Sequence, residues 1–201
     1  VGRRAFDDDA DNTELTITTV GNEFEFTFSE ERARIEVHAV ADPPDKNTGT
    51  IDEEKLDDET AELRFDIPLL TERVIGIVDW LGGFPQTRPL HIGCFGASTG
   101  GGAALLAASR RPEAISAVVS RGGRPDLAGD RALECVQAPT LLIVGGEDEP
   151  VIRINRMSFK HLRCPKRLDI VPGATHLFEE PGALEEVARL SAEWFLEYLP
   201  R

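Results

Sequence analysis

The sequence predicts an α/β fold, in which a mostly parallel sheet with helices on both faces follows short antiparallel strands at the N-terminus. From Arg64 onward, compact apolar runs alternate with helix-sized amphipathic segments, the pattern of a parallel sheet with crossover helices. Before that point, residues 13–40 alternate between apolar and polar side chains, as half-buried strands do. A chain of 201 residues with 41% hydrophobic content suits one core domain with an appendage.

The N-terminal part is predicted to hold three strands followed by a loop. The alternating stretches are residues 15–17, 24–28 and 35–39. Gly21-Asn22 fits a hairpin turn between the first two. Residues 41–62 lack periodicity and carry a run of Asp and Glu, which is typical of a solvated loop or linker. We therefore expect an acidic segment over residues 1–62 and a core domain over residues 63–201.

Four helices and four strands are expected in the core domain. Asp66 and Pro68 start the first helix and Gly82-Gly83 ends it. Its expected apolar face is Leu70, Val74, Ile77, Val78 and Leu81. Strands are expected at 90–95, 115–120, 139–144 and 167–171, and further helices near 99–110, 151–162 and 183–198. Trp80 and Trp194 lie on apolar helix faces and are expected in the core.

The charge is strongly acidic and unevenly distributed. The net charge is −14, and residues 1–62 contain 19 acids and 6 bases. Such a surface repels phosphate backbones, so nucleic acid is not expected as a partner. Of the 22 bases, 18 are Arg, a bias that suggests a protein kept soluble in concentrated salt. A GC-rich genome combined with an acidic segment would explain the same bias without a halophilic source.

Neither a membrane span nor a disulfide framework is indicated. No apolar run approaches the ~18 residues that a span requires, and no signal peptide is visible, so we expect a cytoplasmic protein. Cys94, Cys135 and Cys164 are odd in number without a CxxC pair, which predicts reduced, mostly buried thiols. Because HExxH and clustered metal ligands are absent from the sequence, no metal or other cofactor is expected.

The strongest motif is Gly96-Ala97-Ser98-Thr99-Gly100, which follows a predicted strand and leads directly into a predicted helix. This is the context of a nucleophile elbow. We expect Gly96 and Gly100 to flank a turn too tight for Cβ atoms, so that Ser98 projects at the strand's C-terminal end. There the helix dipole and the Thr99 N–H can stabilise an oxyanion. A phosphate-binding turn would also be Gly-rich, but neither GxxxxGK[ST] nor a complete GxGxxG is present.

An elbow serine needs a base and an acid, in the chain order Ser, Asp or Glu, His. The strand at 139–144 runs into Glu147-Asp148-Glu149, and the strand at 167–171 leads to His176. Parallel strands put these side chains on the same sheet edge as Ser98. We choose Asp148 as the acid and His176 as the base, although Glu147 or Glu149 could substitute if the loop turned differently. His38, His91 and His161 are expected to be surface or packing residues.

Two arginines, Arg121 and Arg124, follow the strand at 115–120 and so also open on that edge. Two guanidinium groups there could bind a substrate carboxylate. A loop in which Asp126 or Asp130 pairs with them explains the same residues without a ligand.

Three segments carry a family resemblance: Gly96-Ala97-Ser98-Thr99-Gly100, Gly145-Gly146-Glu147-Asp148 and Pro172-Gly173-Ala174-Thr175-His176-Leu177-Phe178. They resemble the α/β-hydrolase superfamily, specifically its dienelactone-hydrolase-like branch, over about residues 57–201. The resemblance implies an α/β-hydrolase-type sheet and a serine hydrolase with Ser98, Asp148 and His176 as its triad. Dienelactone hydrolases proper use cysteine at the elbow, so Ser98 is closer to the esterase-like relatives, and Cys94 lies four residues too early to replace it.

The N-terminal part departs from that family. The family places an apolar strand and a His-Gly type loop before the first core helix, and this loop supplies the second oxyanion N–H. Residues 38–42 are the nearest counterpart and contain no glycine. Related hydrolase domains occur fused to phosphoribosyltransferase domains, but no phosphoribosyl-binding loop is recognisable in this chain.

We therefore expect an enzyme that cleaves a small carboxylic ester, lactone or thioester through an acyl-enzyme. Its partner is a small-molecule substrate, and a homodimer is retained as a hypothesis. A hydrolase-fold binding or assembly module with an impaired oxyanion hole is the rival interpretation. Acyl transfer to an acceptor other than water is a third, since the same triad could support it.

Overall fold

A computed structural model describes residues 14–20, 23–29, 35–40 and 65–199, with side chains described for residues 65–199. The chain divides into two compact units, Val1–Glu53 and Glu54–Arg201. The predicted loop at 41–62 lies outside the described residues, and the predicted boundary after residue 62 stays a prediction. Among the described residues, no helix is both long and apolar enough to cross a membrane.

The N-terminal unit contains a three-stranded sheet in the order β2-β1-β3. Its strands are β1 (Glu14–Val20), β2 (Glu23–Ser29) and β3 (Ile35–Val40). β1 and β2 are antiparallel with Val20 opposite Glu23, which leaves two residues for the expected hairpin turn; those two lie outside the described residues. β3 runs parallel to β1, although an antiparallel strand was expected. Alternation of side chains specifies a strand without specifying its direction.

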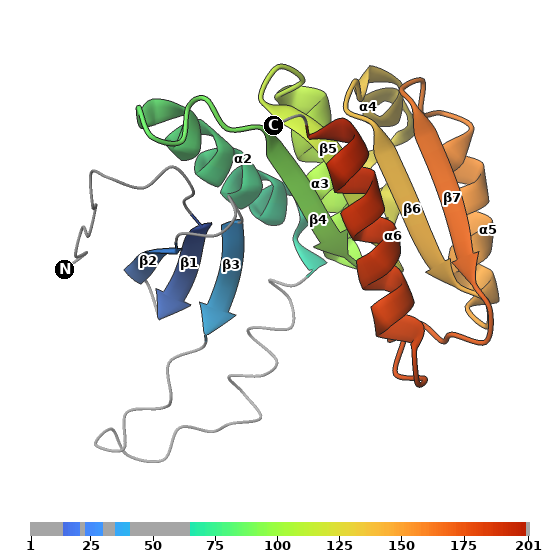
Figure 1. The fold of residues 1–201 in the computed structure, drawn as a ribbon. Coiled ribbons are helices and arrows are strands. Elements are labelled where there is room, and N and C mark those ends of the chain that lie inside the picture. The colour runs from blue at the N-terminus through green and yellow to red at the C-terminus, as the bar shows by residue number, and fades with distance from the viewer. Residues whose placement is uncertain (1–13, 21–22, 30–34, 41–64, 200–201) are drawn as a thin grey trace, which may run out of the picture. The chain divides into compact units, whose positions relative to one another are not determined.

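The second unit contains a four-stranded, all-parallel sheet in the order β4-β5-β6-β7 (Figure 1). Its strands are β4 (Ile92–Ala97), β5 (Ile115–Arg121), β6 (Thr140–Gly145) and β7 (Lys166–Val171). Its helices are α2 (Ile67–Gly83), α3 (Thr99–Arg110), α4 (Asp130–Cys135), α5 (Glu149–Phe159) and α6 (Ala183–Tyr198), with a 3₁₀ turn η1 (Pro125–Ala128). The α/β architecture predicted for the core domain is confirmed, with α4 and η1 as additions.

Two hydrophobic cores lie on opposite faces of this sheet. One packs α2, α3 and α4 against side chains such as Val118 and Leu142. The other packs α6 against the alternate positions of the same strands, such as Val119 and Leu141. Figure 1 shows α6 in front of the sheet with α3 and α4 behind it. Helices therefore cover both faces, and all four strands end at one edge.

The first core helix begins where the sequence predicts. The Asp66 carboxylate caps α2 by accepting from the Leu69 N–H at 2.9 Å, and α2 ends at Gly83. Its buried stripe is Ile67, Thr71, Ile75, Val78 and Leu81, which is rotated from the expected face. Trp80 is therefore 39% exposed, contrary to expectation, while Trp194 is buried as expected.

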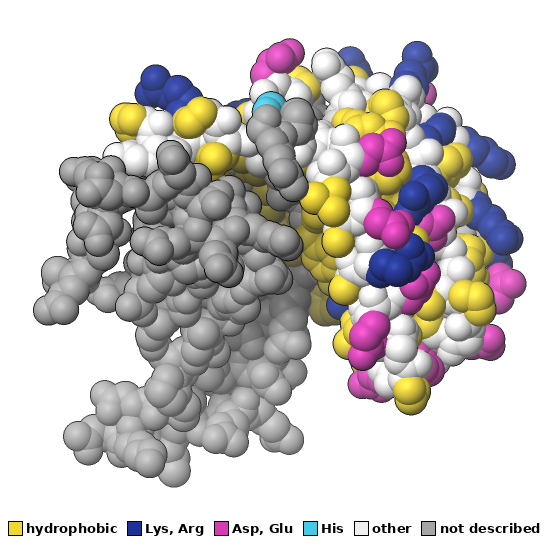
Figure 2. Space-filling view, viewed as in Figure 1, with side chains coloured by type: hydrophobic (Ala, Val, Ile, Leu, Met, Phe, Trp, Pro, Cys, Tyr) yellow, Lys and Arg dark blue, Asp and Glu magenta, His cyan; other side chains and the backbone are white. Residues whose placement is uncertain are grey.

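The surface around α6 carries both signs of charge (Figure 2). Arg189 pairs with Glu186 and Glu193 along this helix. Opposite charges interspersed in this way keep a surface soluble without a strong field of one sign.

Candidate active site

Ser98 occupies the turn between β4 and α3 with a φ of 49° and a ψ of −122°. Positive φ is costly for a serine and persists only where the surroundings impose it. Here the Ser98 N–H donates to the Arg121 carbonyl at 3.1 Å. Its carbonyl accepts from the N–H groups of Gly101 at 3.1 Å and Arg124 at 3.0 Å. The strained turn is thus held by backbone hydrogen bonds to α3 and to the segment that follows β5.

The glycines around Ser98 have different reasons to be glycine. A Cβ on Gly96 would lie 2.4 Å from the Gly100 carbonyl oxygen, so the prediction for Gly96 is confirmed. The same prediction for Gly100 is wrong, because a Cβ there meets nothing within 4 Å. On the next two residues, Gly101 and Gly102, a Cβ would lie 2.3 Å from the Ser120 hydroxyl and 2.6 Å from the Arg124 carbonyl oxygen, respectively. The first turn of α3 therefore packs directly on β5 and its following loop.

Thr99 is the first residue of α3, so its backbone N–H belongs to the positive end of the helix dipole beside Ser98. This is the position expected of an oxyanion donor. The expected counterpart of the second donor loop, residues 38–42, falls on β3 and on residues outside the described ones.

Asp148 follows β6 and caps α5, where one carboxylate oxygen accepts from the Val151 N–H at 3.4 Å. Its side chain is 11% exposed. Glu147 and Glu149, the two alternatives, are exposed. Of these three carboxylates, Asp148 is the one that contacts a histidine.

His176 lies in the loop after β7, and its Nδ1 is 2.6 Å from the Asp148 Oδ2. With Nδ1 donating to the carboxylate, the imidazole keeps Nε2 available as an acceptor. The ring lies beside Gly122, where a Cβ would be 3.6 Å from its Cε1. Gly122 comes directly after Arg121, whose carbonyl accepts from the Ser98 N–H. Ser98, Asp148 and His176 thus come from three loops at the same edge of the sheet.

The loop that carries His176 is anchored by Phe178 and Glu180, a role that the sequence does not predict for either residue. Phe178 is fully buried and has a φ of 59°. The Thr175 N–H donates to the Glu180 carboxylate at 3.0 Å, and hydrogen bonds from the Thr175 side chain and from this N–H hold the pKa of Glu180 below its usual value. Phe178 ends the segment that carries the family resemblance, but neither it nor Glu180 belongs to a periodic pattern that would predict an anchoring role.

The two candidate arginines differ in their contacts. Arg124 forms paired hydrogen bonds with Asp126 at 2.8 and 2.7 Å, as the ligand-free interpretation of this loop expects. Arg121 lies over the Phe178 ring, 5.3 Å from its centroid, and donates to the Leu177 carbonyl at 3.4 Å. Partial burial lowers the pKa of Arg121. Within residues 65–199, Arg121 has no carboxylate partner.

The remaining histidines and the cysteines lie apart from this cluster. His161 lies near Asp130 and Glu134, and the exposed His91 near Ser116. His38 belongs to β3, whose side chains are outside the described residues. The three cysteines are free: Cys164 is buried, Cys94 half-buried and Cys135 exposed, so the expectation of mostly buried thiols is wrong for Cys135. Burial raises the pKa of Cys94 to about 12, which makes it a poor nucleophile at neutral pH.

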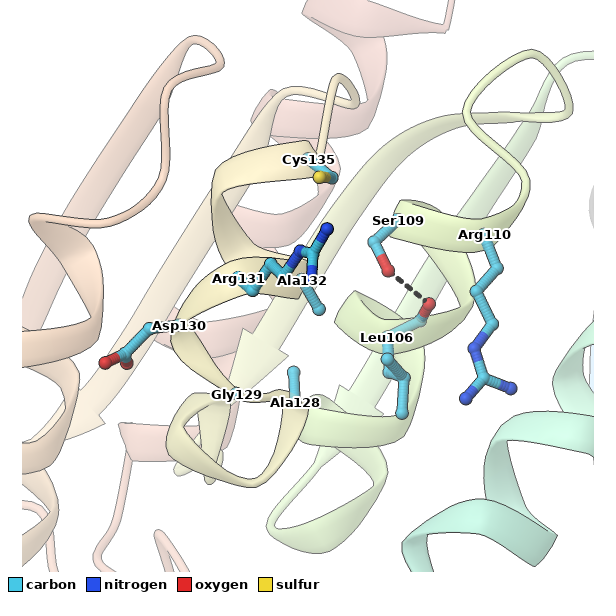
Figure 3. A pocket seen from close by; sticks show the side chains of 9 residues that line it. All are labelled: Leu106, Ser109, Arg110, Ala128, Gly129, Asp130, Arg131, Ala132 and Cys135. Carbon is cyan, nitrogen blue, oxygen red and sulfur yellow. Dashed lines mark hydrogen bonds between the residues drawn. The ribbon is translucent and has the colours of Figure 1, made fainter.

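A hollow of about 470 Å³ lies among α3, η1 and α4 (Figure 3). Its walls include Leu106, Arg110 and Cys135, and Ser109 there donates to the Leu106 carbonyl. These α3 residues belong to the end of the helix opposite Ser98. The hollow is therefore separate from the candidate triad.

The chain matches both a protein-family model and curated proteins. The model of the dienelactone hydrolase family matches residues 51–198. Curated proteins from two strains of Mycobacterium tuberculosis, each named "Putative phosphoribosyl transferase", are 55% identical over 135 residues, 67% of this chain. The chain spans only 30% of the length of those proteins.

Solved structures with the same fold include a dienelactone hydrolase from Anabaena variabilis. It is 50% identical with a TM-score of 0.70, over 88% of this chain and 73% of its own. A monoacylglycerol lipase from Paleococcus ferrophilus is 20% identical with a TM-score of 0.55, over 65% of this chain and 75% of its own, and shows the fold alone. The family match, which covers most of the chain, shows that this chain belongs to the dienelactone hydrolase family, and its sheet and helices have the α/β-hydrolase fold.

Proposed function

We propose that this chain is a serine hydrolase that cleaves a small carboxylic ester, lactone or thioester. The observation that carries the proposal is the 2.6 Å contact between His176 Nδ1 and Asp148 Oδ2, on the sheet edge where Ser98 occupies its strained turn. A histidine fixed by a carboxylate, together with a serine on a strand-to-helix turn, is the arrangement that acyl transfer requires.

In the proposed reaction, Ser98 Oγ attacks the substrate carbonyl carbon while His176 Nε2 takes the hydroxyl proton. Asp148 holds the imidazole in the required tautomer and stabilises its charged form. The Thr99 N–H donates to the oxyanion of the tetrahedral intermediate. When that intermediate collapses, the leaving alcohol or thiol takes the proton from His176. Water, deprotonated by His176, then attacks the acyl-enzyme, which releases the carboxylic acid and restores Ser98.

Labelling with a fluorophosphonate probe tests this proposal directly, because only an activated serine reacts. Wild type, Ser98→Ala and His176→Ala are compared in molar KCl, which screens repulsion among the acids of residues 1–62. We expect labelling of the wild type and loss of labelling in both variants. A folded wild type that failed to label would contradict the proposal and would favour the binding-module interpretation. If the wild type is labelled, competition between water and added alcohols for the acyl group, measured with unlabelled enzyme and an ester substrate, separates hydrolysis from acyl transfer.

We further propose that Arg121 binds an anionic substituent of the substrate. The guanidinium of Arg121 is partly buried and has no carboxylate partner among the described residues, which supports it as the group that binds the anion. Arg124, in contrast, already pairs with Asp126. Arg121→Met should therefore raise KM by about tenfold for an ester with a carboxylate, and leave KM for its neutral analogue unchanged. Arg124→Met is the matched control, and an equal effect of both variants on both esters would contradict the assignment.

A further inference from the structure

A fully buried amide lies in the middle of helix α5. Asn155 has no exposed surface, and its side-chain Nδ2 donates two hydrogen bonds, each 2.9 Å long. One goes to the Val151 carbonyl within the same helix, and the other crosses to the Gly123 carbonyl in the segment after β5. The second bond joins two parts of the fold that lie 32 residues apart in sequence.

The segment that receives this bond is the one that holds the nucleophile. The carbonyl of Arg121 accepts from the Ser98 N–H at 3.1 Å, and the N–H of Arg124 donates to the Ser98 carbonyl at 3.0 Å. Between them, the Gly122 N–H donates to the Ile143 carbonyl at 2.7 Å. A displacement of the Gly123 backbone would therefore be transmitted to the two backbone bonds that join this segment to Ser98.

The helix that supplies this bond is the one that begins at the acid. Asp148 caps α5 and contacts His176, and Asn155 lies seven residues, or about two turns, further along. A helix is stiff over two turns. The bond from Asn155 to Gly123 therefore fixes α5, which begins at Asp148, against residues 121–124, which hold Ser98.

Burial of the Asn155 amide lowers the stability of the fold, because one of its polar atoms is left without a hydrogen bond among the described residues. The Asn155 Oδ1 is buried, and within residues 65–199 it has no hydrogen-bond partner; the Ser120 hydroxyl, packed on Gly123, is in the same condition. Burying an unpaired carbonyl oxygen is unfavourable, and an apolar residue of the same size would avoid that penalty. The two N–H donors of Asn155 are therefore the feature that distinguishes it from leucine at this position.

We propose that Asn155 is a positioning residue that sets the distance between Ser98 and His176. The inference rests on the proposed serine hydrolase function. Misplacement of reacting groups by about 1 Å can reduce the rate of reaction by ~10²-fold, so one bond at this junction can matter even though Asn155 never touches substrate.

The test is the rate constant of fluorophosphonate labelling as a function of pH, measured well below each variant's melting temperature. Asn155→Ser keeps a hydroxyl that can bond to the Val151 carbonyl but cannot reach Gly123, so it removes the crossing bond selectively. Asn155→Leu removes both bonds while keeping the branching and the number of side-chain heavy atoms. We expect both variants to lower the plateau rate by about tenfold or more. The midpoint of the profile should stay in place, because the contact between Asp148 and His176 is unaltered.

Ile152→Ala is the matched control, since Ile152 is a buried residue of the same helix that packs on Val144 and Val151. This variant should melt at a lower temperature yet label at the wild-type rate. Wild-type labelling rates in Asn155→Ser and Asn155→Leu would overturn the inference, as would a decrease that merely follows the fraction unfolded. Failure of the wild type to label would overturn the proposed function itself, and this inference with it.

Discussion

The turn that carries Ser98 and the loop that carries His176 are held by different means. Around Ser98, backbone atoms approach one another closely, and glycines make that approach feasible. Around His176 the backbone is also closely packed, since a Cβ on Gly145 would lie 2.4 Å from the Ala174 carbonyl oxygen, but side chains hold the loop as well: Phe178 is buried and Glu180 accepts the Thr175 N–H. The comparison teaches that both segments are sensitive to added atoms, whereas the His176 loop is in addition sensitive to the removal of side chains that hold it.

The largest expected effect is on the rate of catalysis, and it comes from a substitution that leaves both the Ser98 turn and the His176 loop intact. Asp148→Asn preserves the shape of the side chain but favours the wrong tautomer of His176, so kcat should fall by about 10⁴-fold. The melting temperature should change little, since Asn is also a good helix cap. Hydrolysis of an activated ester and a thermal melt measure the two quantities. A loss of activity matched by unfolding would mean that Asp148 is structural only.

Truncation of the buried Phe178 side chain tests whether this residue anchors the loop that carries His176. Phe178→Ala should lower the free energy of unfolding by about 3–5 kcal/mol, because it empties a fully buried site. Leu177→Ala is the control, since Leu177 is 58% exposed, and it should change stability by less than ~0.5 kcal/mol. Chemical denaturation of both variants makes the comparison, and equal stabilities would refute the anchoring role of Phe178.

Added methyl groups test the turn of the nucleophile. Gly96→Ala forces a Cβ against the Gly100 carbonyl and should destabilise the fold by about 1–3 kcal/mol. Gly100→Ala meets open space within α3 and should stabilise it by up to ~1 kcal/mol, because alanine is the better helix former. Denaturation curves should therefore shift in opposite directions. Shifts in the same direction would mean that close backbone contact does not define this turn.

The smallest expected effect is the contribution of Glu180 to the stability of the fold at acid pH. Hydrogen bonds from the Thr175 side chain and N–H lower the pKa of Glu180 from its ordinary 4.5, so they stabilise the fold above that value and are lost as the pH falls through the folded-state pKa. Glu180→Gln retains an acceptor oxygen but cannot titrate. Between pH 7 and pH 3, its melting temperature should therefore decline slightly less than that of the wild type. A decline equal to that of the wild type would exclude Glu180 as a contributor.

The sequence predicts the elements of the core domain because each long segment has one clear periodicity. α4 escaped prediction because the six residues of Asp130–Cys135 are too few to show a helical repeat. Thr71 is buried where the apolar pattern predicted Leu70, since a single polar residue in the stripe shifts the apparent face of α2. The direction of β3 was wrong for a related reason, as alternation is the same in both directions.

The candidate site was predictable only where a motif marks it. Ser98 lies in a five-residue pattern with a strand before it and a helix after it, and chain order then selected Asp148 and His176. Arg121 and Arg124 looked alike in sequence, and only the position of Asp126 separates them. Asn155 was unpredictable, because its role depends on a backbone carbonyl 32 residues away.

Asp148 uses its two carboxylate oxygens for two purposes, one toward His176 and the other toward the N–H that opens α5. Under the proposed mechanism, selection for folding and selection for chemistry therefore act on the same residue. A descendant that abandoned catalysis would still be under pressure to keep an aspartate there, while its serine and histidine drifted. An aspartate at position 148 of a relative is therefore weak evidence that the relative is an active enzyme. Loss of Ser98 or His176 would be stronger evidence that catalysis had been lost.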